Sequence, residues 1–371
     1  MKKLLVLTYE FPPLGGGAGP VGYEIAERLS ETGDFDIDAV TMGYKDLKEY
    51  EEVNQNFRIH RVKCLRSKKE ICHPWEQATY LFSAYSKCKE LIRKNKYDIC
   101  HTHFLVPTGI LAVKLKEKFS LPYIITAHGS DVPGFNTDRF KFMHKFTGPL
   151  LRKVCRNADL ITAPSDYLKS LILKNIDTAL DKKTKVIPNG FDPDKFKPAG
   201  KKKIILGTGR LLPRKGFQHL ISACADENIG YEIHICGDGP MMKNLKYLQK
   251  NSKTKVVLHG WVDNRSEKYK NLLESADIFT LPSSKENASV ALLEGMSAGC
   301  AVVTSDTAGC PETVGDTAVL VKPENTMDLK QKLTDLTQDQ NKIRSLQSKA
   351  RERLVNKLNW DIVIKEYLNI L

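Results

Sequence analysis

The sequence predicts an α/β protein with two doubly wound domains, and three observations lead to this fold class. At 371 residues, the chain is too long for one ordinary hydrophobic core and suits two. Short apolar runs alternate with stretches of helical periodicity, which is typical of parallel sheets covered by helices on both faces. This alternation stops at residues 187–198, a segment rich in Pro, Gly and Asn, and then starts again.

The expected domains are residues 1–186 and 199–352, joined by the linker 187–198 and followed by a helical tail over 353–371. In the first domain we expect strands over 3–8, 35–41, 57–62, 98–103, 122–126 and 158–163, and helices over 21–32, 77–94 and 109–119. In the second domain we expect strands over 203–210, 231–236, 256–262, 278–282 and 301–304.

The composition is that of a globular protein, with 41% hydrophobic and 27% charged residues. No run of 18 apolar residues predicts a membrane span. The apolar part of residues 1–8 is too short for a signal peptide and lacks a cleavage site, so we expect the first strand of a cytoplasmic protein. Nine scattered cysteines without paired spacing indicate reduced, buried thiols. The net charge of +13 indicates anionic partners, namely nucleotides, nucleic acid or a membrane surface.

The most informative stretch is residues 284–303, which read as a loop, a helix and a buried strand. We expect Asn287 or Ser289 to cap the helix and Gly299 to end it. Glu286 then lies at the mouth of the helix, and Glu294 lies about two turns inside it, roughly 12 Å away. A helix N-terminus suits a phosphate, and carboxylates accept hydrogen bonds from hydroxyl groups. The pattern therefore favours a nucleotide-sugar, although two such glutamates also occur near a helix by chance.

A glycine-rich loop follows the first strand at residues 15–19, where Gly16 and Gly17 let backbone N–H groups approach a diphosphate. The spacing Gly17-x-Gly19-x-x-Gly22, with Asp38 downstream, also matches a dinucleotide fingerprint. That fingerprint should follow its strand directly, whereas residues 9–16 intervene here and a proline lies inside it. We favour a diphosphate loop, and a solvated glycine turn is the other alternative.

Three further residues are candidates for the site. Arg210 and Lys215 follow the strand 203–210, and a forked guanidinium beside an ammonium suits a diphosphate whose charge grows as it leaves. His128 lies just beyond the strand 122–126, where ligands bind in open α/β sheets, although a lone histidine can also be purely structural. His101 and His103 would face one side of a strand, but without a third ligand we expect no metal site.

The order of these motifs resembles the retaining GT-B glycosyltransferases of family 4, also called glycosyl transferases group 1, over nearly the whole chain. The most specific parts are the block from Glu286 to Glu294 and the pair Arg210 and Lys215. The resemblance implies two Rossmann-like domains facing a cleft, with the acceptor on the first and the donor on the second. It also implies that the tail 353–371 crosses back onto the first domain.

The resemblance implies roles for the candidate residues. Glu286 would hold the transferred sugar, Glu294 the ribose of the donor, and His128 the sugar near the reacting carbon. The other donor contacts it implies are Gly16, Gly17, Arg210 and Lys215 on the diphosphate, Val262 at the base, and Asn287, Ala288 and Ser289 near the sugar. The family often has Phe-Gly where this chain has Asn287 to Ser289, which leaves the donor sugar open. No metal or other cofactor is expected.

The function expected from this resemblance is retaining transfer of a sugar from a UDP- or GDP-sugar to a cell-envelope glycan or lipid-linked acceptor. A sugar-nucleotide epimerase of the same architecture is an alternative, and it would convert the donor without an acceptor. A non-catalytic nucleotide-binding protein is another, and it would bind nucleotide without transferring or hydrolysing sugar.

Two basic, aromatic segments are expected at the surface, where they could contact an anionic membrane on its cytoplasmic face. The first contains Arg58, Arg61, Lys63, Arg66, Lys68, Lys69, Trp75, Tyr80 and Phe82. The second covers residues 139–156, for which a helix packed on the sheet with a solvated basic face is the alternative. Nucleic acid is not an expected partner, because no stacking motif or recognition helix is evident.

Overall fold

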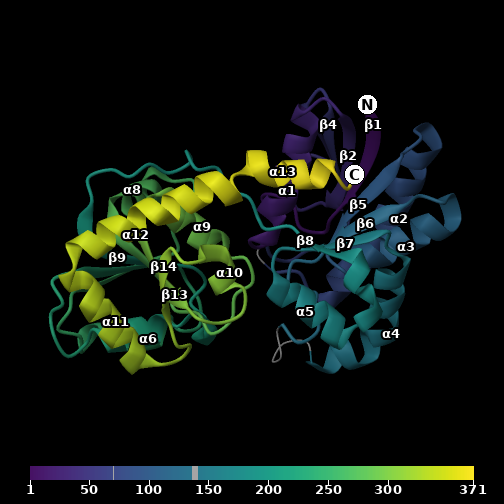
Figure 1. Ribbon diagram of the computed structural model, residues 1–371. Coiled ribbons are helices and arrows are strands. Elements are labelled where there is room, and N and C mark those ends of the chain that lie inside the picture. The colour runs from purple at the N-terminus through teal and green to yellow at the C-terminus, as the bar shows by residue number, and fades with distance from the viewer. Residues whose placement is uncertain (70, 136–140) are drawn as a thin grey trace. The chain divides into compact units, whose positions relative to one another are not determined.

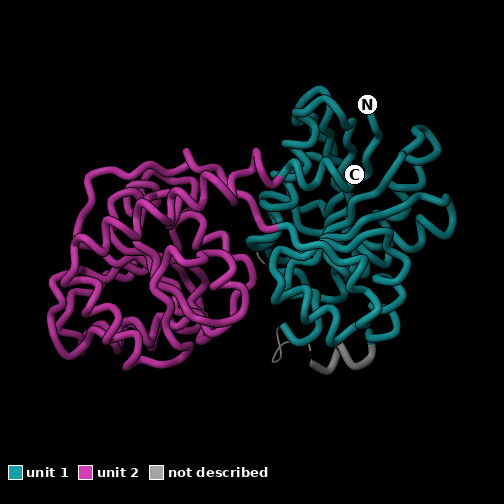
Figure 2. The backbone as a smooth tube through the Cα atoms, viewed as in Figure 1, with its two compact units in different colours: residues 1–187, 364–371 teal, residues 188–363 magenta. Residues whose placement is uncertain are grey.

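The computed structural model describes residues 1–69, 71–135 and 141–371, and over 141–146 only the backbone. The chain forms two compact units (Figure 2). Unit 1 contains Met1–Ile187 and Ile364–Leu371, and unit 2 contains Pro188–Val363. Each unit has its own core of buried apolar side chains.

Unit 1 is built on an eight-stranded sheet of order β3-β4-β2-β1-β5-β6-β7-β8 (Figure 1). All neighbouring strands are parallel except β3 and β4. The strands are β1 Lys2–Leu7, β2 Phe35–Met42, β3 Tyr50–Asn54, β4 Phe57–Val62, β5 Ile99–His103, β6 Tyr123–Thr126, β7 Leu160–Ala163 and β8 Thr184–Val186. The strand order reverses between β1 and β5, which is where ligands bind in sheets of this kind.

The helices of unit 1 are α1 Ala18–Glu31, α2 Pro74–Lys94, α3 Thr108–Phe119, α4 Lys141–Asn157 and α5 Asp166–Asn175. Helix α2 begins three residues before its predicted start, because Pro74 occupies the first helical position and Glu76 accepts a hydrogen bond from the backbone N–H of His73 at 2.7 Å. The last residues of the chain, Ile364–Leu371, also belong to this unit, and they include most of helix α13 Trp360–Leu368. Lys2 donates a hydrogen bond to the carbonyl of Leu371 there, at 2.8 Å.

Unit 2 is a six-stranded parallel sheet of order β11-β10-β9-β12-β13-β14. Its strands are β9 Lys202–Thr208, β10 Glu232–Cys236, β11 Val256–Gly260, β12 Ala276–Leu281, β13 Ala301–Ser305 and β14 Ala318–Val321. Its helices are α6 Phe217–Ala223, α7 Met242–Lys250, α8 Glu267–Ser275, α9 Val290–Ser297, α10 Cys310–Val314, α11 Thr326–Gln338 and α12 Gln340–Arg353. The order reverses between β9 and β12, as in doubly wound nucleotide-binding folds.

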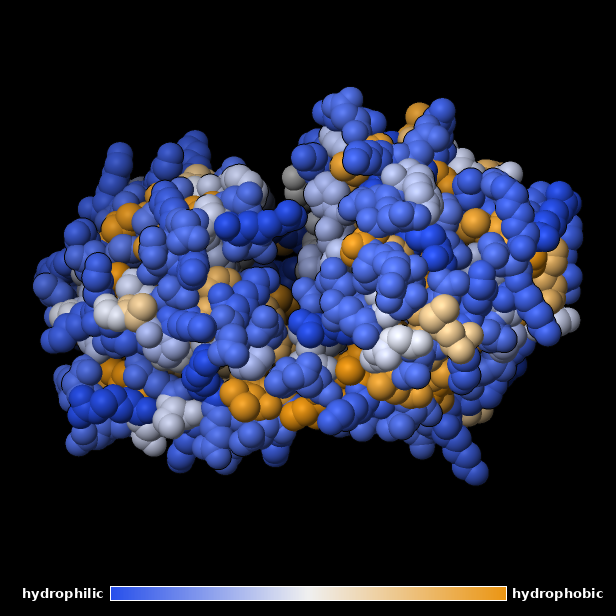
Figure 3. All heavy atoms as spheres, turned by 90° about the horizontal axis from the view of Figure 1, so that it is seen from above, coloured by the Kyte–Doolittle hydropathy of each residue, from blue (hydrophilic) through white to orange (hydrophobic). Residues whose placement is uncertain are grey.

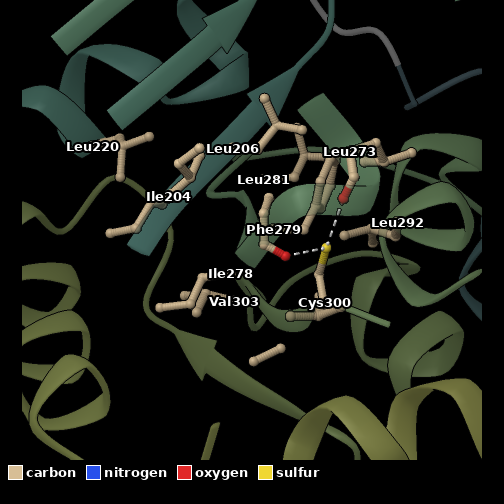
Figure 4. Packing of buried hydrophobic residues seen from close by; sticks show 14 of the residues in the cluster. Ile204, Leu206, Leu220, Leu273, Ile278, Phe279, Leu281, Leu292, Cys300 and Val303 are labelled. Atoms are coloured by element: carbon tan, nitrogen blue, oxygen red, sulfur yellow. Dashed lines mark hydrogen bonds between the residues drawn. The ribbon is translucent and has the colours of Figure 1, made fainter. Parts of the chain in front are cut away.

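The core of unit 2 explains why β12 and α9 stay together. Phe279 and Leu281 of β12 and Leu292 of α9 are fully buried in one cluster (Figure 4). Cys300, between α9 and β13, lies 3.5 Å from the carbonyl of Leu273 and 3.3 Å from that of Ala276. Seven of the nine cysteines are buried free thiols, as predicted, while Cys64 and Cys72 are partly exposed.

The residues predicted as a linker between the domains are mostly part of unit 2. From Pro188 onward they belong to unit 2, and Phe191 and Phe196 are buried in its core. The predicted tail 353–371 also divides, because residues up to Val363 belong to unit 2 and only Ile364–Leu371 belong to unit 1.

The first basic, aromatic segment is only partly at the surface. The prediction was wrong for Arg58, which pairs with Asp36 and Asp38, and for Arg61, which is buried and lies 2.6 Å from Glu51.

The prediction of a surface position was also wrong for Tyr80, whose side chain is buried. Its hydroxyl donates hydrogen bonds to the backbone carbonyls of Val40 in β2 and Thr8, the residue after β1. Trp75 and Phe82 are exposed, at 61% and 80%.

The second segment, 139–156, coincides largely with α4, but residues 139 and 140 lie outside the described residues, as do the side chains of 141–146. Within the described part of the chain, no helix is both long and apolar enough to span a bilayer. Hydrophilic residues predominate on the face drawn in Figure 3, with apolar residues in small groups.

Candidate active site

The centre of the candidate site is an ion pair between Lys215 and Glu286. Lys215 lies in the loop after β9 and Glu286 in the loop after β12, the two strands between which the order of the unit 2 sheet reverses. The Nζ atom of Lys215 lies 2.6 Å from Oε1 of Glu286, and each side chain is 12% exposed. The two residues therefore meet at the edge where ligands bind in doubly wound sheets.

Glu286 is held as a carboxylate. The hydroxyl of Ser283 lies 2.9 Å from Oε1, and Nη1 of Arg214 lies 3.4 Å from the same atom. Burial by itself would raise the pKa of Glu286, but Lys215 and then Arg214 outweigh it, so the pKa lies below its ordinary value. These contacts of Glu286 all meet at Oε1, and a carboxylate has further lone pairs with which it accepts a ligand hydroxyl.

Arg214 is a residue of the site that sequence reasoning missed. It donates a hydrogen bond to the carbonyl of Lys285 at 3.0 Å, and its Nη1 atom lies 3.4 Å from Oε1 of Glu286, the oxygen that Lys215 also contacts. The predicted partner, Arg210, is exposed two residues beyond β9. Only the adjacency of Arg214 to Lys215 could have indicated its place.

A single turn brings these residues together. Pro213–Lys215 form one 3-10 turn, which ends at Gly216 in the left-handed conformation, φ +75°. A Cβ atom at Gly216 would lie 2.0 Å from the carbonyl oxygen of Pro282, so only glycine lets the loop after β9 pack on the loop after β12. The backbone N–H of Ser284 donates to the carbonyl of Arg214 at 2.8 Å and fixes the same contact.

Glu294 is buried inside α9, with 6% exposure. Its Oε2 accepts a hydrogen bond from the hydroxyl of Tyr269 in α8 at 2.6 Å, and that hydroxyl also lies 3.4 Å from Oγ1 of Thr208, the last residue of β9. Burial raises the pKa of Glu294 above its ordinary value, although the bond from Tyr269 works against this. Tyr269 is a second residue that the sequence did not indicate.

The N-terminus of α9 lies between the two glutamates in the chain. Ser289 is the N-cap residue, as predicted, but its side chain makes no capping hydrogen bond. Two hydrogen bonds hold the loop that leads into the helix. The side chain of Asn189 donates to the carbonyl of Ala288 at 3.0 Å, and the backbone N–H of Gly309 donates to the carbonyl of Glu286 at 2.9 Å.

The other two predicted donor contacts of unit 2 lie near the same edge of the sheet. Asn287 is buried in the loop between Glu286 and the N-cap of α9. Val262 is half-buried two residues beyond β11.

In unit 1, the glycine-rich loop follows β1, next to the reversal of strand order. The N–H of Gly16 donates to the carboxylate of Glu10 at 3.2 Å, and Gly17 is the N-cap residue of α1. Asp38, which a dinucleotide fingerprint would place on a ribose, is buried instead and bonds to Arg58 and His60. The structure therefore does not favour the dinucleotide alternative.

His128 follows β6 at the same edge of the unit 1 sheet. Its backbone N–H donates to Asp131 at 3.1 Å, and Asp131 also accepts from the N–H of Leu105 at 2.8 Å, so the loops after β6 and β5 are joined. The Nε2 atom of His128 lies 3.1 Å from Nδ1 of His103, a contact that sequence reasoning missed. Within the described residues, no group of three His, Cys, Asp or Glu is arranged to hold a metal.

Comparison with known proteins identifies the family. Residues 15–195 match the model "Glycosyltransferase Family 4", and residues 189–353 match "Glycosyl transferases group 1". An uncharacterized glycosyltransferase of Methanocaldococcus jannaschii is 28% identical, over 99% of this chain and 97% of its own length.

A second relative is the UDP-Gal:alpha-D-GlcNAc-diphosphoundecaprenol alpha-1,3-galactosyltransferase of Escherichia coli, 29% identical over 82% of this chain and 80% of its own. Among solved structures, sucrose-phosphate synthase from Thermosynechococcus elongatus superposes with a TM-score of 0.83 at 19% identity, covering 100% of this chain and 98% of its own. The two family models together span both units, and the chain therefore belongs to the family 4, group 1 glycosyltransferases of GT-B fold.

Proposed function

We propose that this glycosyltransferase moves a sugar from a nucleotide-diphosphate sugar, UDP- or GDP-linked, to a cell-envelope glycan or lipid-linked acceptor, with retention at the anomeric carbon. The observation that carries the proposal is the Lys215–Glu286 pair at the reversal of the unit 2 sheet. It sets a cation for a diphosphate beside a carboxylate for a sugar hydroxyl, which is the pairing that a nucleotide-sugar requires.

The reaction breaks the bond between the anomeric carbon and the diphosphate oxygen, and negative charge builds on the departing diphosphate. Lys215, Arg210 and the free N–H groups of α9 stabilise that charge, which is electrostatic catalysis. Lys215 is paired with Glu286 before the donor binds, so its ammonium either moves to the diphosphate or bridges both anions.

The acceptor hydroxyl attacks the anomeric carbon on the face that the diphosphate leaves, and its proton passes to a diphosphate oxygen. Retention enters from the resemblance to family 4. Because cationic side chains supply the positive charge, we include in the proposal that no divalent metal is needed.

The two glutamates fix the ends of the donor. The Oε2 atom of Glu286 accepts a hydroxyl of the sugar, since Oε1 is engaged by Lys215, Arg214 and Ser283. Glu294 accepts a ribose hydroxyl at Oε1, because Tyr269 occupies Oε2.

A lipid-linked acceptor is supported by the exposed face at the start of α2. Trp75 and Phe82 are seven residues apart, hence on one side of the helix, and both are exposed. Arg66, Lys68 and Lys69 precede them in the chain, and the whole protein carries a net charge of +13. Such a face suits the cytoplasmic surface of an anionic membrane.

The test is to incubate the protein with UDP- and GDP-sugars, with and without a diphosphate-lipid-linked glycan, and with and without EDTA. We expect transfer only when both substrates are present, an unchanged rate in EDTA, and an anomeric configuration by NMR equal to that of the donor. Conversion of the donor without any acceptor would indicate an epimerase, and binding without conversion would contradict the enzymatic proposal.

The membrane part is tested by sedimentation with anionic vesicles at low salt. We expect the protein to pellet with vesicles and the double variant Trp75→Ser, Phe82→Ser to remain in solution. Absence of pelleting by the unchanged protein would favour an acceptor without a lipid.

A further inference from the structure

Three histidines lie together at the carboxyl ends of β5 and β6 in unit 1. His101 and His103 alternate along β5 and so face one side of the sheet, with ring centroids 4.3 Å apart. The ring of His103 is stacked on that of His128 at 5.3 Å. Of the three, only His128 has an expected role, near the transferred sugar, which leaves the role of the buried pair open.

His103 has little freedom to turn. Helix α1 crosses directly over its ring at Gly22, where an added Cβ atom would lie 3.4 Å from two ring atoms. On the other sides lie the rings of His101 and His128. In this orientation Nδ1 of His103 lies 3.1 Å from Nε2 of His128, while Nε2 of His103 is buried without a hydrogen-bond partner among the described residues.

Counting protons decides the direction of the bond between the two rings. Burial lowers the pKa of His103 well below its ordinary value and that of His128 to about 3, so each neutral ring carries one proton. If His128 donates, the only proton of His103 must lie on Nε2, as a buried N–H without an acceptor. If His103 donates from Nδ1, only a lone pair remains unmatched, and buried orphan N–H groups are rare.

His101 obeys the same rule. Its Nε2 atom lies 2.8 Å from Oγ1 of Thr126, and its Nδ1 is the buried atom without a partner among the described residues. Placing the proton on the bonded nitrogen again leaves a lone pair, and not an N–H, unmatched.

From this geometry we infer that His103 is a positioning residue, which donates from Nδ1 to Nε2 of His128 and thereby holds the single proton of His128 on Nδ1. The consequence for the reaction rests on the proposed function. His128 then has no lone pair available as a base, and it acts as an N–H donor toward an oxygen of the bound donor sugar. The acceptor's proton must leave by another group, which agrees with its transfer to the diphosphate.

The tautomer can be measured without substrate. In full-length protein labelled with ¹⁵N-histidine, long-range ¹H–¹⁵N correlations distinguish protonated from unprotonated ring nitrogens, and loss of signals in His128→Asn assigns His128. We expect a protonated Nδ1 and an unprotonated Nε2 on His128 from pH 8 to pH 6, the opposite of the tautomer that free imidazole side chains prefer. A proton on Nε2, or a doubly protonated ring in this range, would overturn the inference.

Matched variants test the role in catalysis. His103→Asn keeps an N–H near the position of Nδ1, whereas His103→Leu fills similar space without a donor. We expect kcat to fall about 10- to 100-fold in the leucine variant, the range found when the hydrogen-bond partner of a metal-ligating histidine is removed, and to be largely rescued in the asparagine variant. If kcat fell equally in His103→Leu and His103→Asn while both melting temperatures were unchanged, His103 would have only a packing role.

His128 itself is tested in the same way. His128→Asn keeps a donor near Nδ1 but has no basic nitrogen, so it should retain more activity than His128→Leu. If both variants are equally inactive while folded, His128 is needed for more than donation and the inference fails. Absence of sugar transfer by the unchanged protein would remove the proposed function, yet the tautomer measurement would still decide the relation between the two histidines.

Discussion

At the scale of single residues, the chemistry depends on a lysine that already has a carboxylate partner. Lys215 is 12% exposed and lies 2.6 Å from Glu286, so its charge is held in place before any ligand arrives. Preorganised charge of this kind is worth most where negative charge develops in the transition state.

Replacing Lys215 should therefore affect the chemical step. We expect Lys215→Ala to lower kcat by about 10²- to 10³-fold, the range seen when one donor to a developing oxyanion is removed. Steady-state kinetics with the identified donor would measure this, with Lys246→Ala, an exposed lysine of α7, as the control. A change confined to the KM of the acceptor would contradict this role.

Arg214 should behave differently from Lys215. It is 32% exposed and contacts Glu286 at the longer distance of 3.4 Å, so it orients the carboxylate more than it neutralises a leaving group. We expect Arg214→Ala to lower kcat by only about tenfold, equivalent to ~1.4 kcal/mol. A loss as large as that of Lys215→Ala would assign Arg214 to the diphosphate itself.

Glu294 offers a residue-scale prediction in which stability and binding change in opposite directions. Burial raises the pKa of Glu294 in the folded protein, so folding favours the protonated carboxyl. The protonated carboxyl contributes its full stability at a pH below the ordinary pKa of glutamate, and this stability is lost as the pH rises through the raised pKa of the folded state. At neutral pH the buried charge is thus a cost. Glu294→Gln should raise the melting temperature at pH 7.5 by ~2–4 °C, as for a gain of about 1 kcal/mol.

The same variant should weaken nucleoside diphosphate binding at least about tenfold, because a hydrogen bond to a charged group is lost. The difference in melting temperature between variant and parent should shrink as the pH falls toward 4. A destabilised variant at pH 7.5, or unchanged nucleotide affinity, would show that Glu294 is a structural carboxylate.

At the scale of elements, the site is a contact between two loops that only glycine permits. Gly216 and Gly230 have the same φ of +75°, but an added Cβ atom would meet the Pro282 carbonyl at 2.0 Å in the first and nothing within 4 Å in the second. Gly230→Ala should therefore cost about 1 kcal/mol for the left-handed conformation alone.

Gly216→Ala should cost about 2 kcal/mol more than Gly230→Ala and should also lower activity, because the loop carrying Lys215 must shift. Urea unfolding of both variants measures the difference. Equal costs would mean that the two loops of the site adjust freely.

The elements also show what could be predicted from the sequence. The alternation of apolar runs and helices indicated most strands, including β12 and β13 around α9, because buried parallel strands are continuous apolar runs. It missed β3, an edge strand whose sequence is mostly polar, β8, an edge strand of three residues, and β14, the edge strand of unit 2. Tyr269 could not be foreseen, since its role depends on the fold bringing its hydroxyl, from α8, within 2.6 Å of Glu294 in α9.

The misplaced arginines have an equally simple cause. Arg58 counted as a surface charge because its carboxylate partners are 20 and 22 residues away in sequence. In the sheet, Asp38 of β2 is in register with Arg58 of β4, and the two charges neutralise each other. Residue type and spacing along the chain hold no information about such register.

At the scale of the whole molecule, the chain has two separate hydrophobic cores, one in each unit, and the proposed contacts to the nucleotide are mainly residues of unit 2. A ligand stabilises the part of a protein that binds it in the folded state. In calorimetry we expect UDP or GDP to raise the melting temperature of unit 2. The free energy of unfolding of this unit should increase by about 2.7 kcal/mol at a nucleotide concentration of 100 times Kd.

The transition of unit 2 can be assigned with Gly230→Ala, which should lower it alone. If the nucleotide raised only the transition that Gly230→Ala leaves unchanged, the principal nucleotide site would have to be moved to unit 1.

The most direct test compares nucleoside diphosphates with the matching monophosphates by isothermal titration calorimetry, in the unchanged protein, Lys215→Ala and the control Lys246→Ala. We predict that the diphosphate binds at least about tenfold more tightly than the monophosphate, a difference of ~1.4 kcal/mol, and that Lys215→Ala removes this preference while Lys246→Ala keeps it. Equal binding of the two nucleotides, or a preference that survives in Lys215→Ala, would contradict a diphosphate site at the Lys215–Glu286 pair.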